Sequence, residues 1–223
     1  MKINSIFEAI EGEGMEVGTP KTFIRLQGCS MNCITCDTPE AQDFNKGKEM
    51  TVEQIADKVK EFNHKYITIT GGNPLEHNIE NLTNLVTKLV RPNKFYVTLE
   101  VTGCENCNTP QISKLFNRVN FISFDMKSPS SKCKQSFDSS NIGWTFKSQY
   151  KIIVADWHDY KYAKQMIKKY RTCKIILTPC WEVNNEINKE FVQELNKKIL
   201  KDNLKCRVII QQHKIIYGHK KNV

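Results

Sequence analysis

Short runs of β-branched and aromatic residues recur along the chain, separated by segments with helical periodicity. A capping box opens at Thr51 and leads into apolar residues at helical spacing, and a second apolar stripe runs from Ile79 to Leu89, ended by Pro92. We expect further helices at 159–170 and 187–201. The runs themselves predict seven buried strands: Thr22–Gln27, Tyr66–Thr70, Phe95–Val101, Asn120–Met126, Tyr150–Ala155, Lys174–Thr178 and Cys206–Gln211.

This alternation of strand and helix is typical of βαβ units, so the fold class is α/β with a mainly parallel sheet. Seven strands with only about four convincing helices are too few for an eightfold barrel, which favours a partial (β/α)6-type barrel, open on one side. No linker divides the chain, so we expect a single domain over residues 1–223. Chemically unusual loops directly follow four of the strands, and we expect these loops to share one rim.

Composition limits the class of protein. The chain has 223 residues, 39% hydrophobic and 26% charged, and its longest apolar runs fall far short of the roughly 20 residues that span a bilayer. The N-terminal residues lack the apolar segment of a secretory signal, so we expect a cytoplasmic protein without membrane contact. Nine cysteines are an odd number and do not suit a disulfide framework in the cytosol, which favours metal or redox chemistry.

Charge is unevenly distributed along the chain. Residues 1–80 carry 8 Lys+Arg and 13 Asp+Glu, a net charge of −5, which leaves +14 for residues 81–223 in a chain of net charge +9. Such a surface could contact nucleic acid. The basic residues are spread over predicted helix faces, however, without interleaved aromatic residues, so we favour a solvated surface and no stable nucleic-acid binding.

The clearest chemical signal is the C-x3-C-x2-C loop of Cys29, Cys33 and Cys36, which follows the first predicted strand. A [4Fe–4S] cluster normally takes four cysteines, so three would leave one iron open, as in a catalytic metal site. Two alternatives remain at this point: a zinc site completed by a distant Cys or His, and cysteines buried as small hydrophobic residues.

The loop resembles the cluster-binding loop of the radical S-adenosylmethionine (SAM) superfamily. Further motifs follow one family of that superfamily in order, over essentially the whole chain. These motifs are Glu11-Gly12-Glu13-Gly14, Phe23-Ile24-Arg25-Leu26-Gln27-Gly28-Cys29, Cys36-Asp37-Thr38, Thr70-Gly71-Gly72-Asn73-Pro74, Lys127-Ser128-Pro129-Ser130-Ser131 and Gln212-His213-Lys214. The chain thereby resembles the 7-carboxy-7-deazaguanine synthases.

The resemblance implies a carbon–nitrogen lyase that converts 6-carboxy-5,6,7,8-tetrahydropterin into 7-carboxy-7-deazaguanine and ammonia, on the route to queuosine and related deazapurines. It implies a [4Fe–4S] cluster that cleaves SAM to a radical, which removes hydrogen from pterin C6. By resemblance, the cluster ligands are Cys29, Cys33 and Cys36. Thr38 matches the ligand of a Mg²⁺ ion that would offset the charge of the substrate carboxylate.

The resemblance also assigns residues to SAM and to the pterin. Those implied for SAM are Thr35, Asp37, Gly72, Asn73, Ser128, Pro129, Ser130 and Thr178. Those implied for the pterin are Ile10, Glu11, Gly12, Arg25, Thr70 and His213. Carboxylates suit the donor groups of a pterin, and an arginine fork suits a carboxylate. Taken singly, Arg25 could equally be an ion-paired strand residue and His213 a surface histidine.

Some positions depart from the family pattern. Asn73 stands where most radical SAM proteins have Glu, as in a subset of this family, and Glu11 replaces the usual Gln. Cys104 and Cys107 form a C-x2-C that the family does not require, and we interpret them as reduced surface thiols in preference to a second metal site.

Two other functions compete with this interpretation. One is a radical SAM activase of a glycyl-radical enzyme, and the other is a zinc-binding nucleic-acid module. The family also implies a homodimer and an electron donor such as flavodoxin or ferredoxin.

Overall fold

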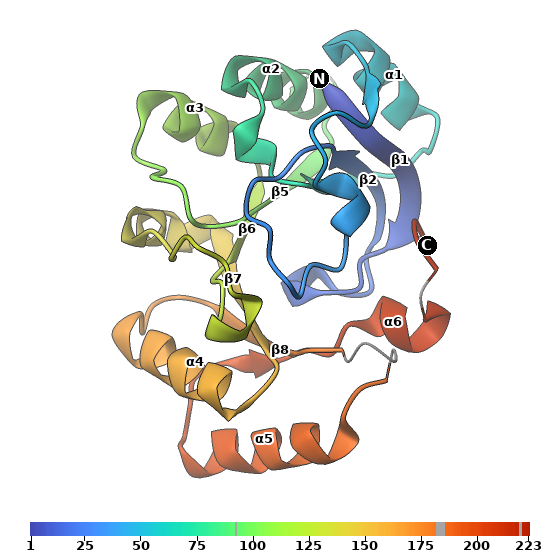
Figure 1. Ribbon diagram of the computed structural model, residues 1–223. Coiled ribbons are helices and arrows are strands. Elements are labelled where there is room, and N and C mark those ends of the chain that lie inside the picture. Colours follow the sequence, from blue (N-terminus) through green and yellow to red (C-terminus); the bar gives the residue numbers. More distant parts are fainter. Residues whose placement is uncertain (92, 182–185, 219) are drawn as a thin grey trace.

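The computed structural model describes residues 1–91, 93–181, 186–218 and 220–223 (Figure 1). The strands are β1 (Lys2–Ile10), β2 (Pro20–Leu26), β3 (Lys48–Glu49), β4 (Tyr66–Gly71), β5 (Tyr96–Val101), β6 (Phe121–Asp125), β7 (Ser148–Val154), β8 (Ile175–Pro179) and β9 (Arg207–Val208). The α-helices are α1 (Val52–Lys60), α2 (Ile79–Val90), α3 (Pro110–Arg118), α4 (Trp157–Lys169), α5 (Lys189–Lys201) and α6 (Gln212–Tyr217). Short 3₁₀ turns are η1 (Gly14–Glu16), η2 (Pro39–Ala41), η3 (Pro74–Glu76), η4 (Pro129–Ser131) and η5 (Ser139–Lys147).

All nine strands form one curved sheet in the order β3-β1-β2-β4-β5-β6-β7-β8-β9. From β2 to β9 the neighbouring strands are parallel, whereas β1 pairs antiparallel with both β2 and β3. Figure 1 shows α1 to α5 on the outer side of the curved sheet, whereas α6 carries His213 and Lys214, which line the inner cavity. The expected partial, mainly parallel barrel is confirmed.

The hydrophobic core lies between the sheet and its outer helices. Outward-facing strand residues such as Ile24 and Leu26 are fully buried there, together with Leu82, Leu85 and Leu89 from one stripe of α2. The spacing of these three leucines matches the helical period that predicted this helix from the sequence. The inner face of the sheet is therefore left free to carry polar side chains.

The seven predicted strands correspond to β2 and β4–β9, and the four predicted helices to α1, α2, α4 and α5. The capping box at Thr51 is present, since its side chain accepts from the Gln54 amide and Gln54 reaches back to the Thr51 amide. Pro92, the predicted end of α2, lies outside the described residues. After β6, 3₁₀ turns replace the crossover helix, as expected of an incomplete barrel.

The antiparallel strand β1 was not predicted. Its register shifts between Ile3 and Ser5, which breaks the strict alternation of apolar and polar residues that identifies a strand. The helix α3 was also missed, although Thr109 caps it and Pro110 occupies its first turn. Its buried residues Ile112, Leu115 and Phe116 stand at i, i+3 and i+4, so the helical period was present in the sequence and was overlooked.

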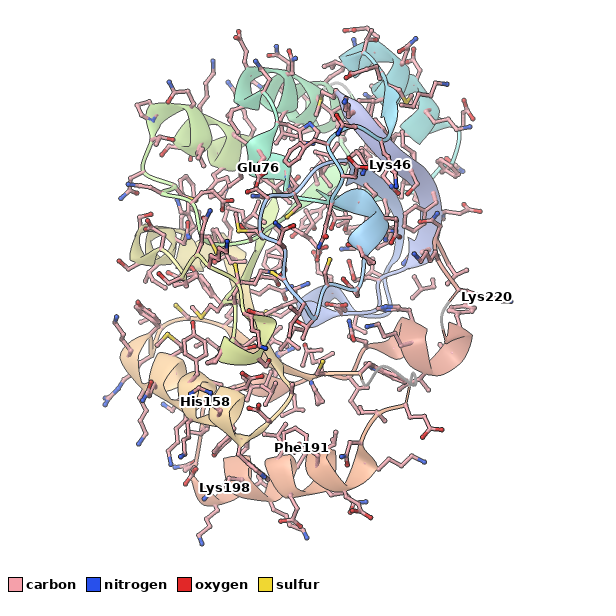
Figure 2. All side chains as sticks on the ribbon, viewed as in Figure 1. Lys46, Glu76, His158, Phe191, Lys198 and Lys220 are labelled. Carbon is pink, nitrogen blue, oxygen red and sulfur yellow. The ribbon has the colours of Figure 1, made fainter. Side chains whose placement is uncertain are left out.

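Eight of the 25 basic residues after position 80 lie on α4 and α5. Lys161 and Lys168 are exposed, as is Lys198 (Figure 2), and Lys164 forms an ion pair with Asp202 at 2.7 Å. This placement agrees with a solvated surface. In the described part of the chain, no helix is long and apolar enough to cross a bilayer.

Replacement of a buried leucine in α2 should destabilise the fold through a cavity that the rigid sheet cannot fill. We expect Leu82→Ala to lower the free energy of unfolding by about 2–5 kcal/mol. Leu200 is 80% exposed at the end of α5, so Leu200→Ala should change it by less than about 0.5 kcal/mol. Equilibrium denaturation measures both, and equal losses would contradict this description of the core.

Candidate active site

The inner face of the sheet carries polar and charged side chains near the carboxyl ends of five neighbouring parallel strands. These residues line a cavity of about 650 Å³. They are Arg25 on β2, Thr70 on β4, Glu100 on β5, Asp125 on β6 and Lys151 on β7. Side chains alternate between the two faces of a strand, so this inner row is the counterpart of the apolar outer row that packs against the helices.

The four loops expected at one rim do meet there. Cys29 follows β2, Gly71 ends β4, Thr102 follows β5 and Lys127 follows β6, and all four residues line the cavity. Parallel strands place their carboxyl ends at the same edge, so residues far apart in sequence converge. The cavity thereby collects nearly all the motifs that the sequence singled out.

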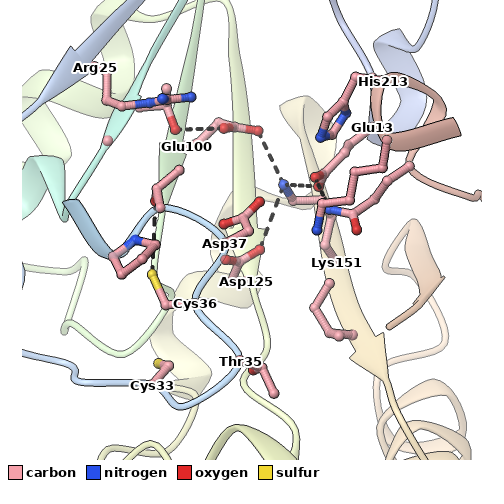
Figure 3. Close-up of a pocket in the computed structure, with 18 of the residues that line it drawn as sticks. Glu13, Arg25, Cys33, Thr35, Cys36, Asp37, Glu100, Asp125, Lys151 and His213 are labelled. Atoms are coloured by element: carbon pink, nitrogen blue, oxygen red, sulfur yellow. Dashed lines mark hydrogen bonds and ion pairs between the residues drawn. The ribbon is translucent and has the colours of Figure 1, made fainter. Parts of the chain in front are cut away.

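The cysteine loop forms one end of the cavity. Cys29, Cys33 and Cys36 are free, partly exposed and among the lining residues (Figure 3). Burial raises the pKa of the Cys29 and Cys33 thiols, so a positively charged metal centre would be needed to hold them as thiolates.

The three thiols come from one short loop and line the cavity. Within the described ranges, no three His, Cys, Asp or Glu side chains are placed to hold a single metal ion. In a [4Fe–4S] cluster each cysteine binds a different iron, so three cysteines would leave one iron open toward the cavity.

The extra C-x2-C is not a metal site of this kind either. Cys107 is fully buried in the hydrophobic core, so its interpretation as a surface thiol was wrong. The Cys107 thiol donates to the Glu105 carbonyl and the Cys104 thiol to the Thr102 carbonyl. Both thiols bond to nearby backbone, which explains them as structural residues.

The residues expected to contact SAM divide into two groups. Thr35, Asp37, Gly72 and Ser128 line the cavity, as does the expected Mg²⁺ ligand Thr38, whose Oγ1 lies 3.9 Å from Cys36 Sγ. Four others are not among the lining residues: Asn73, Pro129, Ser130 and Thr178.

Of these four, Ser130 and Asn73 form hydrogen bonds with other residues of the protein. Ser130 donates to Asp159 on α4. Asn73 is fully buried, and its amide donates to Glu76 and Glu105. The buried Thr178 hydroxyl has no hydrogen-bond partner among the described residues.

At the other end of the cavity, Arg25 is held by neighbours that leave part of its fork available. Its guanidinium lies 5.0 Å from the centroid of the Phe7 ring, and it donates to Asn222 Oδ1 at 3.0 Å. Glu40 is 3.9 Å away. The Arg25 Nε is buried without a partner in the part of the chain that the structure describes, while the residue itself lines the cavity.

The six residues expected for the pterin all line this cavity. They are Arg25, Ile10, Glu11, Gly12, Thr70 and His213. Gly12 allows His213 to approach, because a Cβ at position 12 would lie 2.0 Å from His213 Nδ1. Burial lowers the pKa of His213, which favours the neutral imidazole. The Thr70 hydroxyl donates to Glu100 at 2.8 Å.

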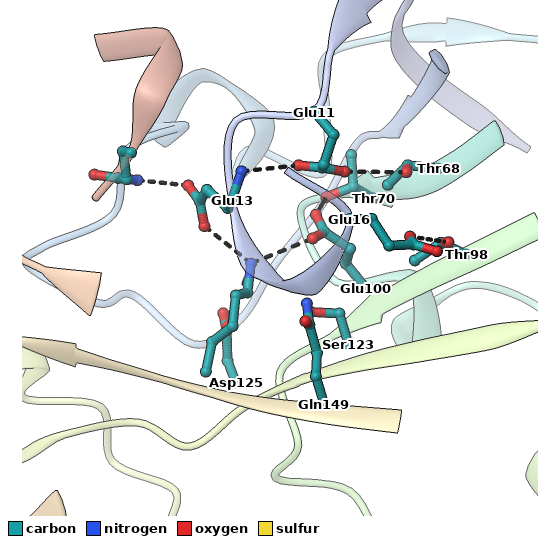
Figure 4. A network of polar contacts seen from close by, with 12 residues as sticks. Glu11, Glu13, Glu16, Thr68, Thr70, Thr98, Glu100, Ser123, Asp125 and Gln149 are labelled. Atoms are coloured by element: carbon teal, nitrogen blue, oxygen red, sulfur yellow. Dashed lines mark hydrogen bonds and ion pairs between the residues drawn. The ribbon is translucent and has the colours of Figure 1, made fainter. Parts of the chain in front are cut away.

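The buried residue Lys151, which also lines the cavity, was not identified from the sequence. The Lys151 ammonium lies 3.0 Å from Glu13, 3.2 Å from Glu100 and 3.8 Å from Asp125 (Figures 3 and 4). These carboxylates hold the pKa of Lys151 well above its usual value despite burial, and Lys151 in turn helps to lower that of Glu13 to about 2. The sequence contained one indication of this role: Lys151 is a charged residue inside a run that otherwise has the composition of a buried strand.

Comparison with known proteins agrees with this site. A family model described as "4Fe-4S single cluster domain" matches residues 10–153. The 7-carboxy-7-deazaguanine synthase of Aquifex aeolicus is 30% identical over 218 residues, which cover 95% of this chain and 91% of that protein. That of Thermoplasma acidophilum is 30% identical over 220 residues, 98% of each chain. The chain belongs to the 7-carboxy-7-deazaguanine synthase family.

Solved structures support the same fold. QueE from Escherichia coli has a TM-score of 0.69 at 22% identity and covers 95% of this chain and 94% of its own. A queuine lyase from Clostridium spiroforme, bound to SAM and queuine, has a TM-score of 0.55 at 14% identity. As a member of the synthase family, the chain is a radical SAM enzyme that uses a [4Fe–4S] cluster and SAM.

Gly12→Ala should displace the His213 ring, because the new methyl group would occupy its position. The displaced imidazole would regain contact with water, so the pKa of His213 should rise toward its ordinary value. Gly143 has open space around its Cα, so Gly143→Ala is the matched control. NMR titration of the histidines measures the shift, and an unchanged His213 in Gly12→Ala would contradict the close approach.

Proposed function

We propose that this enzyme converts 6-carboxy-5,6,7,8-tetrahydropterin into 7-carboxy-7-deazaguanine and ammonia, a ring contraction on the route to queuosine and related deazapurines. One observation supports this most strongly: the three-cysteine loop and the polar groups around Arg25 line opposite ends of one cavity. When bound, the cluster and SAM supply the one-electron chemistry that removes hydrogen from the substrate. The protein must hold the substrate, exclude water and aim its reacting carbon.

In this proposal, different residues at the polar end of the cavity bind different parts of the substrate. Arg25 takes the carboxylate of the pterin through charge-assisted hydrogen bonds. Glu11, Thr70 and His213 face the heterocycle, and the carboxylate accepts from its amino and ring N–H groups. Cys29, Cys33 and Cys36 hold the cluster, while Thr35, Asp37, Gly72, Asn73, Ser128, Pro129, Ser130 and Thr178 surround SAM.

Further parts of the proposal concern partners and location. We place the enzyme in the cytoplasm, because its nine cysteines are an odd number that does not suit a disulfide framework. The whole chain acts as one radical SAM domain and assembles into the homodimer expected of its family. A flavodoxin or ferredoxin reduces the cluster. Positive charge in the C-terminal half is solvated, which leaves no role for nucleic acid.

The reaction can be tested directly with anaerobically reconstituted protein. We expect about four irons per chain, and product and ammonia on addition of the pterin, SAM and a strong reductant. Cys33→Ala should lose both the cluster and turnover, whereas Cys104→Ala should keep both, because the Cys104 thiol bonds only to nearby backbone groups. SAM cleavage without pterin turnover in the unaltered enzyme would contradict the proposed reaction.

Arg25→Ala should impair turnover of the carboxylated pterin. Loss of charge-assisted hydrogen bonds worth roughly 1.5–3 kcal/mol corresponds to about a 10- to 150-fold lower kcat/KM. Cluster content and SAM binding should remain normal, since Arg25 lies at the opposite end of the cavity from the cysteines (Figure 3). Arg171 is exposed after α4, and Arg171→Ala is the control. Equal kinetics for the two variants would remove Arg25 from the substrate site.

We further propose that Thr38 binds Mg²⁺ beside the substrate carboxylate. A hard cation prefers the hydroxyl oxygen and offsets negative charge on the substrate. Thr38→Val keeps the shape of the side chain but removes this ligand, so half-maximal activity should require more Mg²⁺ while SAM affinity stays unchanged. Full activity after exhaustive chelation would show that no such ion takes part.

A further inference from the structure

Lys21 is a fully buried lysine beneath the cavity that the proposed function does not use. Its side chain is 0% exposed, and it is not among the residues that line the cavity. The ammonium lies 3.1 Å from Glu11 Oε2, 2.6 Å from Glu16 Oε2 and 3.1 Å from Thr68 Oγ1. A buried lysine is rare unless it is paired, so this position requires an explanation.

The contacts of Glu11 show what Lys21 does for the cavity. Glu11 Oε2 accepts from Lys21 and lies 3.4 Å from the Thr68 hydroxyl, while Oε1 accepts from the Glu13 amide at 3.3 Å (Figure 4). Glu11 lines the cavity, so its carboxylate is fixed from below and presents its remaining acceptor sites to the space above.

We propose that Lys21 is a positioning residue that favours the charged, acceptor-only form of the Glu11 carboxyl group and holds it in the orientation that binds the donor groups of the pterin. This inference rests on the proposed function, because it assigns Glu11 to the heterocycle. Lys21 itself touches neither substrate nor cofactor. It acts only through Glu11.

The charges around Glu11 explain why an ammonium is needed there. Burial and Glu100 on β5 raise the pKa of Glu11 to about 7, while Lys21 on β2 and Lys151 on β7 lower it. Lys151 lies within ion-pair distance of other carboxylates but not of Glu11, so Lys21 is the cation that directly contacts Glu11 in the described structure. Glu16 shares Lys21 and adds negative charge on the lower side.

Removal of Lys21 should therefore shift the pKa of Glu11 in one direction. Without the ammonium, the charged form of Glu11 becomes less favourable and its pKa rises above 7. At neutral pH the carboxyl group would then be mostly protonated, and it would present a donor where the pterin also presents donors. Substrate binding should weaken at neutral pH and recover as the pH rises.

The experiment measures pterin affinity against pH in reconstituted enzyme with SAM and an oxidised cluster, so that no turnover occurs. In Lys21→Met, we expect an acidic limb moved up by about one pH unit and about fivefold weaker binding at pH 7, since the ionised fraction of Glu11 falls there from about one half to about one tenth. SAM affinity should be unchanged, because Lys21 lies outside the lining of the cavity.

Two further variants separate positioning from a purely structural role. Glu11→Gln cannot titrate, so its binding should lose the acidic limb while Lys21 remains in place. In Lys21→Met/Glu11→Gln the neutral amide needs no ammonium, so binding at pH 7 should recover most of the loss seen in Lys21→Met. Glu11→Gln keeps the test decisive even if Lys21→Met does not fold.

The outcomes are distinct. A Lys21→Met enzyme with lower thermal stability but the pH profile of the unaltered enzyme would overturn the inference and make Lys21 structural only. An acidic limb that persists in Glu11→Gln would also overturn it. Failure of the unaltered enzyme to bind the pterin would instead reject the proposed function.

Discussion

The cost of burying charge inside the barrel determines how this site is built. Glu11, Glu13 and Glu100 lie on the inner face with little contact to water, and isolated carboxylates there would protonate or destabilise the fold. Lys151 and Lys21 provide the compensating charge from two different strands. Breaking such a buried pair from one side typically costs about 3–5 kcal/mol, so the lysines and carboxylates depend on one another.

This network also fixes the polar end of the cavity in place. The β1–β2 connection passes through residues 11–19 and brings Glu11, Gly12 and Glu13 against the inner face, where Glu13 meets Lys151 of β7 and Gln211 near α6. Segments from both ends of the chain are thereby tied to the sheet. The polar end is rigid before any ligand arrives, which reduces the entropy lost on binding and leaves the cysteine loop at the opposite end for the cofactors.

Much of this arrangement follows from sequence patterns, and the exceptions have physical causes. The parallel strands are recognisable because both of their faces are largely covered, and the motif loops necessarily meet at one rim. The register shift in β1 is a local irregularity that periodicity does not detect, whereas the cap and the apolar stripe of α3 were present in the sequence and were overlooked. Lys21 and Lys151 occupy strands that otherwise look buried, and only the three-dimensional pairing shows which carboxylates neutralise each of them.

The most direct test of the account is the fate of the hydrogen at C6 of the pterin. A substrate held by Arg25 and by the polar network should present this carbon to the cofactor end of the cavity. With 6-carboxy-tetrahydropterin deuterated at C6, we predict that deuterium appears in 5′-deoxyadenosine or in SAM during turnover, as measured by mass spectrometry. Product that forms while both molecules remain free of deuterium would contradict the account.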